Sequence, residues 1–298
     1  MRAIRSSPGP HGTVETPVES VLRRQNRDGG WPFGSGASWT EPTVFATLAA
    51  LAAGRKDAAL RAIDWLRRLE RPDGGFAPQP AVEESTWVTS LVALLPPEEL
   101  GGERHQRAVG WLLRLTGRET SRMYRLRQFL AGDTAAASQT LHGWPWFPGT
   151  AAWVGPTSFA MLALGQEQRR RPDPGLAERL DLGRQFLLSR MCADGGWNHG
   201  AARALGYEAQ AYPETTGMAL LALRGVRSPA LDRALQAGSR FLADCRSCDA
   251  QNWLRLGLMA HGSLPAGYDP APLPARTNRD RAVALLADQA AAGKDVFQ

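Results

Sequence analysis

The chain has 298 residues, of which 43% are hydrophobic and 21% are charged, and its formal net charge is +6. This length suits one domain with one core, and no apolar run approaches the roughly 20 residues that span a bilayer. The basic residues are spread out and accompany no nucleic-acid-binding motif, so we expect a solvated surface and no nucleic-acid partner. The polar N-terminal stretch lacks the apolar segment of a secretory signal, which predicts a cytoplasmic protein.

The first part of the chain pairs two helices through a glycine turn. Residues 1–13 are polar and rich in Pro and Gly, and we expect a disordered leader before a single domain over 14–298. A first helix is predicted at roughly 14–24, before Asp28-Gly29-Gly30-Trp31, because glycine can take the left-handed conformation that ends helices. Glu41-Pro42-Thr43 then begins a second helix, with proline in the first turn and an acid near the positive end of the helix dipole.

Later parts of the chain repeat this pairing. An amphipathic, Arg-rich helix comes first, then a turn with an aromatic residue, then a helix rich in Ala, Leu and Thr. The turns are Asp73-Gly74-Gly75-Phe76, Gly143-Trp144 and Asp194-Gly195-Gly196-Trp197. The second helices are predicted to start at Thr43, Thr86, Thr157 and Thr216. Because a structural device is needed in every copy and a catalytic residue only once, we interpret the acids of these turns as turn residues.

The end of the chain departs from the repeat. An insertion at about 118–142 interrupts the third unit, and a fifth unit near Trp253 has lost its glycines. A last helix is predicted near 279–292. Charged helices that alternate with small-residue helices suggest two concentric layers, and repetition on this scale fixes the architecture. The sequence therefore predicts an all-α fold, an (α/α) toroid of about five to six helix pairs.

These motifs resemble those of a known superfamily. Gln25-x-x-Asp28-Gly29-Gly30-Trp31 resembles the QW repeat of squalene–hopene and oxidosqualene cyclases. The inner-helix starts of the same superfamily resemble Glu41-Pro42-Thr43, Glu84-Ser85-Thr86, Glu214-Thr215-Thr216, and Trp144-Pro145-Trp146 followed by Trp153 and Pro156-Thr157. The resemblance to this prenyltransferase and squalene-oxidase repeat group covers about residues 18–262. It implies an (α/α) barrel with an apolar cavity at the inner-helix ends and isoprenoid ligands.

Acids and aromatic residues near the inner-helix starts are the candidate site. Glu41 and Glu214 are the candidate catalytic acids, since the nearby Trp39 and Tyr212 could desolvate them; the alternative is simple contact with the helix dipole. A lining of Trp suits cations, although Trp also fills cores. The candidate ligand-binding residues are Trp39, Glu84, Trp87, Trp153, Tyr212 and Trp253. Class II cyclases, which these motifs resemble, protonate their substrate with an Asp of a D-x-D-D segment. This sequence has no such segment.

Cys245, Cys248 and His261 are the candidate ligands of a zinc site. The resemblance extends to the β-subunits of protein prenyltransferases, which bind zinc through Asp, Cys and His with one residue between the Asp and the Cys. Here Asp244 and Cys245 are adjacent, and one C-x-x-C without a fourth ligand is an incomplete set. We therefore expect no metal and no cofactor.

The leading hypothesis is a class II terpenoid cyclase-like protein. It would bind a polyprenyl or triterpene-type substrate in an apolar central cavity and cyclise or isomerise it without D-x-D-D. One alternative is a non-catalytic toroid that binds an isoprenoid or a partner protein, and another is a relative of the prenyltransferase β-subunits. The insertion, with arginines around Tyr124 and Phe129, is amphipathic and could form a lid or touch a membrane surface. The sequence leaves the substrate and the oligomeric state open.

Overall fold

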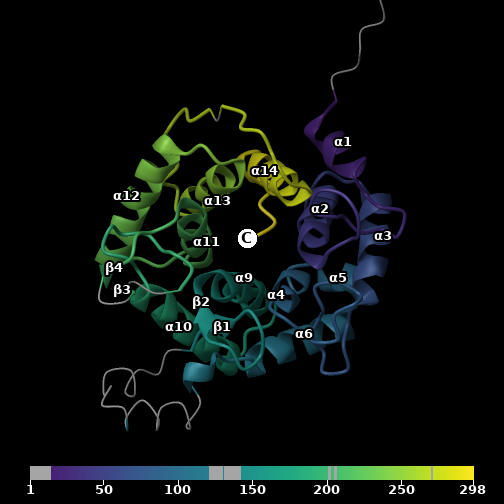
Figure 1. The fold of residues 1–298 in the computed structure, drawn as a ribbon, viewed down its shortest axis with the longest axis horizontal. Helices are drawn as coiled ribbons and strands as arrows, with labels where there is room; N and C mark the ends of the chain where they lie inside the picture. Colours follow the sequence, from purple (N-terminus) through teal and green to yellow (C-terminus); the bar gives the residue numbers. More distant parts are fainter. Residues whose placement is uncertain (1–14, 121–129, 131–141, 201–202, 205–206, 270) are drawn as a thin grey trace, which may run out of the picture.

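The computed structural model describes residues 15–120, 130, 142–200, 203–204, 207–269 and 271–298. The leader predicted at 1–13 and most of the insertion predicted at 118–142 lie outside these residues. The described helices form two concentric layers around one axis (Figure 1). None of them is long and apolar enough to cross a membrane.

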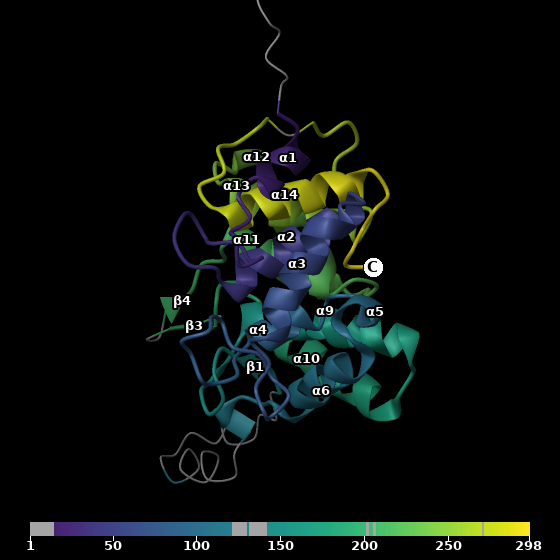
Figure 2. The same ribbon diagram turned by 90° about the vertical axis from the view of Figure 1, so that its right-hand side faces the viewer.

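The inner layer holds the small-residue helices that the sequence predicted and, in addition, the last helix of the chain. Its members are α2 (Thr40–Ala52), α4 (Val88–Val92), α9 (Val154–Arg170), α11 (Pro213–Ala222), α13 (Cys248–Met259) and α14 (Asn278–Ala291). Helix α14 closes the ring, because it packs against both α13 and α2. Figures 1 and 2 both show α14 beside α2. The predicted (α/α) toroid is therefore confirmed.

The outer layer returns the chain between inner helices, so the inner helices all run in one direction. Its members are α1 (Pro17–Leu22), α3 (Lys56–Arg67), α5 (Pro97–Leu100), α6 (Gly102–Arg114), α10 (Pro174–Ser189) and α12 (Pro229–Asp244). The remaining elements are the short helix η1 (Arg118–Thr120), the antiparallel pair β1 (Trp144–Pro145) and β2 (Ala152–Trp153), and the antiparallel pair β3 (Arg203–Ala204) and β4 (Tyr207–Glu208). Both strand pairs lie in connections that lead from an outer to an inner helix.

The aromatic turns join the two layers by the same hydrogen bonds in each unit. The backbone N–H of Trp31 donates to the hydroxyl of Thr43 at 2.8 Å, and the Trp31 indole donates to the carbonyl of Val21 at 2.8 Å. Equivalent backbone bonds to a threonine hydroxyl start from Phe76, Trp144 and Trp197. The carboxylates of Asp28, Asp73 and Asp194 accept the N–H of the second glycine after them. These contacts agree with the interpretation of the acids as turn residues.

The second unit differs from its predicted register. The hydroxyl that accepts the N–H of Phe76 belongs to Thr89 rather than Thr86, and α4 begins only at Val88. The N–H of Thr86 instead donates to the carbonyl of Phe76. In the same way, the N–H of Trp39 donates to the carbonyl of Trp31, and the N–H of Tyr212 donates to the carbonyl of Trp197. The helix start predicted at Thr86 is therefore two residues too early. This inner helix begins with two tight turns, each closed by a hydrogen bond between residues three apart. The N–H of Thr89 donates to the carbonyl of Thr86, and the N–H of Ser90 donates to the carbonyl of Trp87.

Each Asp-Gly-Gly turn is contacted by arginines of the outer helix that belongs to the next unit. This role of the arginines was not predicted from the sequence. Arg68, the C-cap of α3, donates to the carbonyl of Asp28 at 3.0 Å. A Cβ on Gly29 would lie 2.4 Å from the carbonyl oxygen of Arg61, seven residues earlier on the same helix. The same contacts recur at Asp73 with Arg107 and Arg114, and at Asp194 with Arg233 and Arg240. The signal was visible as an Arg-Ala pair followed by a second Arg, seven residues after the first.

Candidate functional site

Four inner helices begin beside an aromatic residue. Trp39, Trp87, Trp153 and Tyr212 are the N-caps of α2, α4, α9 and α11. Because the inner helices run in one direction, these residues lie at one face of the ring, here called the N-terminal face, and together they are the aromatic rim. Trp39 and Trp87 are half-buried, whereas Trp153 and Tyr212 are 36% and 44% exposed. The structure thus brings four predicted ligand-binding residues to a common face.

Three charged side chains lie one step inside the rim. They occupy the second residue of their helices, Glu41 in α2, Asp249 in α13 and Arg279 in α14. Arg279 Nε lies 2.5 Å from Glu41 Oε1, and Arg279 Nη1 donates to Asp249 Oδ1 at 2.7 Å. The three side chains are 15–21% exposed. They form the Glu41–Arg279–Asp249 network, which ties three neighbouring inner helices together.

Burial and pairing act in opposite directions on this network. Burial raises the pKa of Glu41 above its usual range, and the charge of Arg279 opposes that rise. Burial alone would lower the pKa of Arg279, but the carboxylates of Glu41 and Asp249 outweigh it and raise that pKa. Since the guanidinium stays charged and the first turn of α2 adds positive potential, we assign Glu41 as a carboxylate in an ion pair.

Aromatic rings fill the axis of the ring beneath the network. Phe45, Phe159 and Trp253 are each the sixth residue of an inner helix, and their ring centroids lie 5.5–5.9 Å apart. Phe297 approaches from the opposite face and lies 6.2 Å from Trp253, where Figure 1 shows the C-terminus at the ring centre. All four side chains are at most 2% exposed. The open central cavity that the resemblance implied is therefore packed, because equivalent positions of three helices carry large rings.

The rings of this cluster also contact the network. The guanidinium carbon of Arg279 lies 6.0 Å from the Phe45 centroid and 5.9 Å from the Trp253 centroid, within the range of a cation–π interaction. The indole N–H of Trp253 is buried and has no hydrogen-bond acceptor among the described residues. Trp253 is thus a core residue at the axis and not a residue of the helix ends, where it was predicted.

The other predicted residues do not join the network. Glu214 is the second residue of α11 and half-buried, but it makes no side-chain hydrogen bond or ion pair within the described ranges. Glu84 is exposed and lines a separate surface cavity of about 590 Å³ with Phe147. Asp249 and Arg279 were missed as site residues. Their signal was their place at the second position of an inner helix, which needed α14 to be recognised as part of the inner ring.

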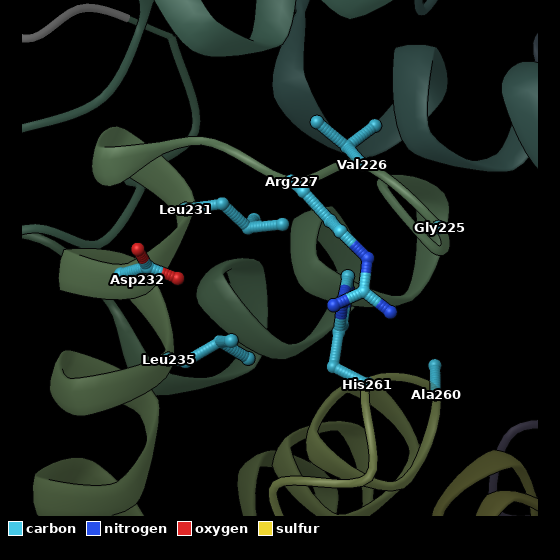
Figure 3. A pocket seen from close by; sticks show the side chains of 8 residues that line it. All are labelled: Gly225, Val226, Arg227, Leu231, Asp232, Leu235, Ala260 and His261. Carbon is cyan, nitrogen blue, oxygen red and sulfur yellow. The ribbon is translucent and has the colours of Figure 1, made fainter.

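The residues considered for zinc are not brought together. Cys245 caps the end of α12, and Cys248 is the first residue of α13. His261 follows the other end of α13, where its Nε2 contacts the carbonyl of Leu220 at 2.8 Å. Burial raises the pKa of the Cys248 thiol to about 11. His261 instead lines a cavity of about 270 Å³ at the far ends of α11 and α13, and Figure 3 shows Arg227 reaching toward it. Across the described residues, no three His, Cys, Asp or Glu side chains are placed to hold a metal ion.

No protein-family model and no curated protein matches the sequence, but solved structures match the fold. The endo-β-1,4-glucanase CMCax from Acetobacter xylinum is 14% identical, with 94% of this chain and 99% of that chain covered and a TM-score of 0.56. The GH76 α-mannanase BT2949 from Bacteroides thetaiotaomicron is 12% identical, with 93% and 94% covered and a TM-score of 0.60. The type II terpene cyclase MstE from Scytonema is 19% identical, with 93% and 76% covered and a TM-score of 0.52.

The chain is an (α/α) toroid. At these identities the similarity describes architecture and not activity, because one fold carries many chemistries. The toroids that match include a terpene cyclase and two enzymes whose names state polysaccharide substrates. The similarity alone therefore assigns no chemistry to this toroid.

Proposed function

We propose that the N-terminal face binds an isoprenoid-type ligand and that it does so without protonating it. The observation that carries the proposal is the layering of aromatic rings, with the aromatic rim above and Phe45, Phe159 and Trp253 below. Such surfaces suit the branched, apolar chain of an isoprenoid. The QW-like turns and the similarity to MstE, of which one structure holds geranylgeranyl dihydroxybenzoate, support the same ligand class. Because the rings are packed, binding requires the half-buried rim residues to part.

The ion pair at Glu41 argues for binding over cyclisation. A proton donor to an alkene must keep its proton until the substrate arrives, which needs a desolvated acid without a cationic partner. Glu41 is desolvated, but Arg279 lies 2.5 Å from it. Asp249 shares the same guanidinium at 2.7 Å. The network is thus better suited to fixing the helix starts than to donating a proton.

The test combines a binding assay with product analysis. Farnesol, geranylgeraniol and squalene are titrated into the protein while tryptophan emission is followed, and each mixture is then extracted for mass spectrometry. We expect saturable binding that weakens about tenfold in Trp87→Ala, which loses the ring lying 5.8 Å from Phe159. Tyr207→Ala is the control, since that side chain is 79% exposed and makes no ring contact among the described residues.

Product analysis decides whether Glu41 or Glu214 acts as an acid. We expect no product from wild type, Glu41→Gln or Glu214→Gln, with binding retained in all three. A cyclised or isomerised product that disappears in one variant, while that variant still binds the ligand, would establish an acid and replace the binding proposal with a cyclase. Absence of isoprenoid binding in the wild type would remove both.

A specific observation favours carbohydrate as the second candidate ligand. Phe147, Trp153, Tyr207 and Tyr212 are 36–79% exposed and lie in connections that lead to the N-terminal face. Exposed aromatic faces pack against the C–H faces of sugar rings, and the glucanase and mannanase share the fold. Cello- and manno-oligosaccharides therefore form a second arm of the titration. Sugar binding that is lost in Trp153→Ala and retained in Trp87→Ala would favour this candidate.

A further inference from the structure

A small apolar cavity opens at the C-terminal face, on the opposite side of the ring from the aromatic rim. It has a volume of about 210 Å³ and lies between α9, α10 and α11. Met161, Leu162 and Leu221 form its apolar wall together with Phe297, which comes from the segment after α14. At roughly 30 Å³ for a water-sized group, this space holds about seven such groups.

Three guanidinium groups line the same cavity. Arg169 lies in the last turn of α9, Arg184 belongs to α10, and Arg224 follows α11. Burial lowers the pKa of Arg169, and the positive charges of Arg224 and Arg170 lower it further. An apolar cavity edged by crowded cations is suited to an amphiphile with an anionic head.

The hydrogen-bond donors of these arginines are not all used. Arg224 pairs with Asp295, and Arg184 pairs with Asp181, which is 59% exposed. Arg169, by contrast, is exposed and donates no side-chain hydrogen bond in the part of the chain that the structure describes. Arg169 is therefore the guanidinium of this cavity that can take an anionic ligand as its partner.

The chain itself shows which chemistry fits this place. Asp295 puts a carboxylate on Arg224, and two residues later Phe297 puts an apolar group into the cavity wall. At this place the protein thus already binds a carboxylate and an apolar group of its own chain, Asp295 and Phe297. Guanidinium groups bind carboxylates with charge-assisted hydrogen bonds, which are among the strongest in proteins.

We propose that this cavity binds a medium-chain carboxylate. Its chain lies against Met161, Leu162 and Leu221, and its head pairs with the exposed guanidinium of Arg169 at the cavity edge, where Arg184 and Arg224 add positive charge. The length of the ligand's alkyl chain follows from the cavity volume of about 210 Å³, which suits octanoate. This site is independent of the isoprenoid proposal, because the two lie at opposite faces of the ring.

Calorimetry with octanoate tests the site on the full chain. Arg169→Gln should weaken octanoate binding about tenfold, because it removes one charge-assisted contact. Arg170→Gln is the matched control, since the neighbouring Arg170 lines a different cavity with Glu103 and Glu167; its affinity should stay within about twofold of wild type. 1-Octanol should bind about tenfold more weakly than octanoate, and acetate should not bind measurably.

Several outcomes would overturn the proposal. They are no octanoate binding to the wild type, equal weakening in Arg169→Gln and Arg170→Gln, and octanol binding as tightly as octanoate. Farnesol titration of Arg169→Gln separates the two proposals. Farnesol affinity should be unchanged there, and loss of octanoate binding alone leaves the N-terminal face untouched.

Discussion

Arg279 is the cation that two half-buried carboxylates of neighbouring helices share. Its side chain is 15% exposed, and Glu41 and Asp249 are 18% and 21% exposed. Their interaction is therefore weakly screened by water, and removing the cation leaves two unpaired buried charges. At this site, the cost of breaking the network is larger than the gain from having formed it.

We predict that Arg279→Met lowers the free energy of unfolding by about 3–5 kcal/mol at pH 7, as measured by urea titration. Burial without a partner raises the pKa of Glu41 further, so the folded state takes up a proton more readily than the unfolded one. The deficit should shrink as the pH falls from 7 toward 5. Arg281→Met, on the same helix, should cost less than about 1 kcal/mol, and an equal loss in both variants would contradict the role of the network.

The turn residue Asp73 should make the stability of the protein depend on pH in the opposite direction. Burial alone would raise its pKa, but hydrogen bonds from Ser85, Gly75 and Trp111 outweigh burial and hold the pKa below its usual range. The stability that follows is present above about pH 4 and is lost as the pH falls through the folded-state pKa. Asp73→Asn should therefore be less stable than wild type at pH 7, and the difference should narrow by pH 3. Melting temperatures at both pH values check this, with Asp57→Asn on the surface of α3 as control.

At the scale of elements, each glycine turn sits against the outer helix of the next unit. Gly29 has a φ of +101°, and an added Cβ would lie 2.4 Å from the carbonyl oxygen of Arg61. Gly36 has a φ of +87°, but an added Cβ there would meet nothing within 4 Å. The two positions share the backbone conformation and differ in the contact between units.

We predict that Gly29→Ala lowers the free energy of unfolding by on the order of 3 kcal/mol or more. Gly36→Ala should cost about 1 kcal/mol, since only the left-handed conformation is penalised. Urea unfolding of the two variants separates the cost of the close contact with Arg61 from the cost of the left-handed conformation. Similar losses would show that the close approach between turn and helix is not required.

The sequence predicted these turns because their signals are local. Asp, Gly and an aromatic residue, followed by a threonine, specify the turn and its bond to the inner helix within about twenty residues. The second unit failed at Thr86 because α4 is only five residues long, so little helical periodicity was present to set its register. The Glu41–Arg279 pair could not be read from the pattern, since it joins helices from opposite ends of the chain and exists only when the ring is closed.

The whole molecule is a ring closed at one seam. The side chain of Asn278 donates to the carbonyl of Pro32 at 2.9 Å, and the side chain of Gln289 donates to the carbonyl of Ala49 at 2.9 Å. The chain beyond α14 then turns inward, with Gln166 donating to the carbonyl of Val296. The sequence did not predict this inward turn, because a single phenylalanine after a helix carries no pattern.

Phe297 reports on the packing of the ring axis. We predict that Phe297→Ala lowers the free energy of unfolding by about 3–5 kcal/mol, since the ring is 1% exposed and packs on Trp253. Tryptophan emission should shift to longer wavelength as water reaches Trp253. Gln298→Ala, at an exposed neighbour, should change neither quantity. Unchanged stability and emission in Phe297→Ala would show that this segment does not fill the axis in solution.

The seam between α14 and α2 also constrains the order of events during synthesis. Helix α2 leaves the ribosome long before the residues that cover its free side, Asn278 to Gln289, which are made about 240 residues later. Until then the nascent chain is an open arc whose edge exposes the apolar face of α2, and unpaired apolar edges favour aggregation. Closure must also bring together residues about 240 positions apart, which slows folding. A chaperone that shields the early units until α14 appears would therefore act at the step with the greatest risk.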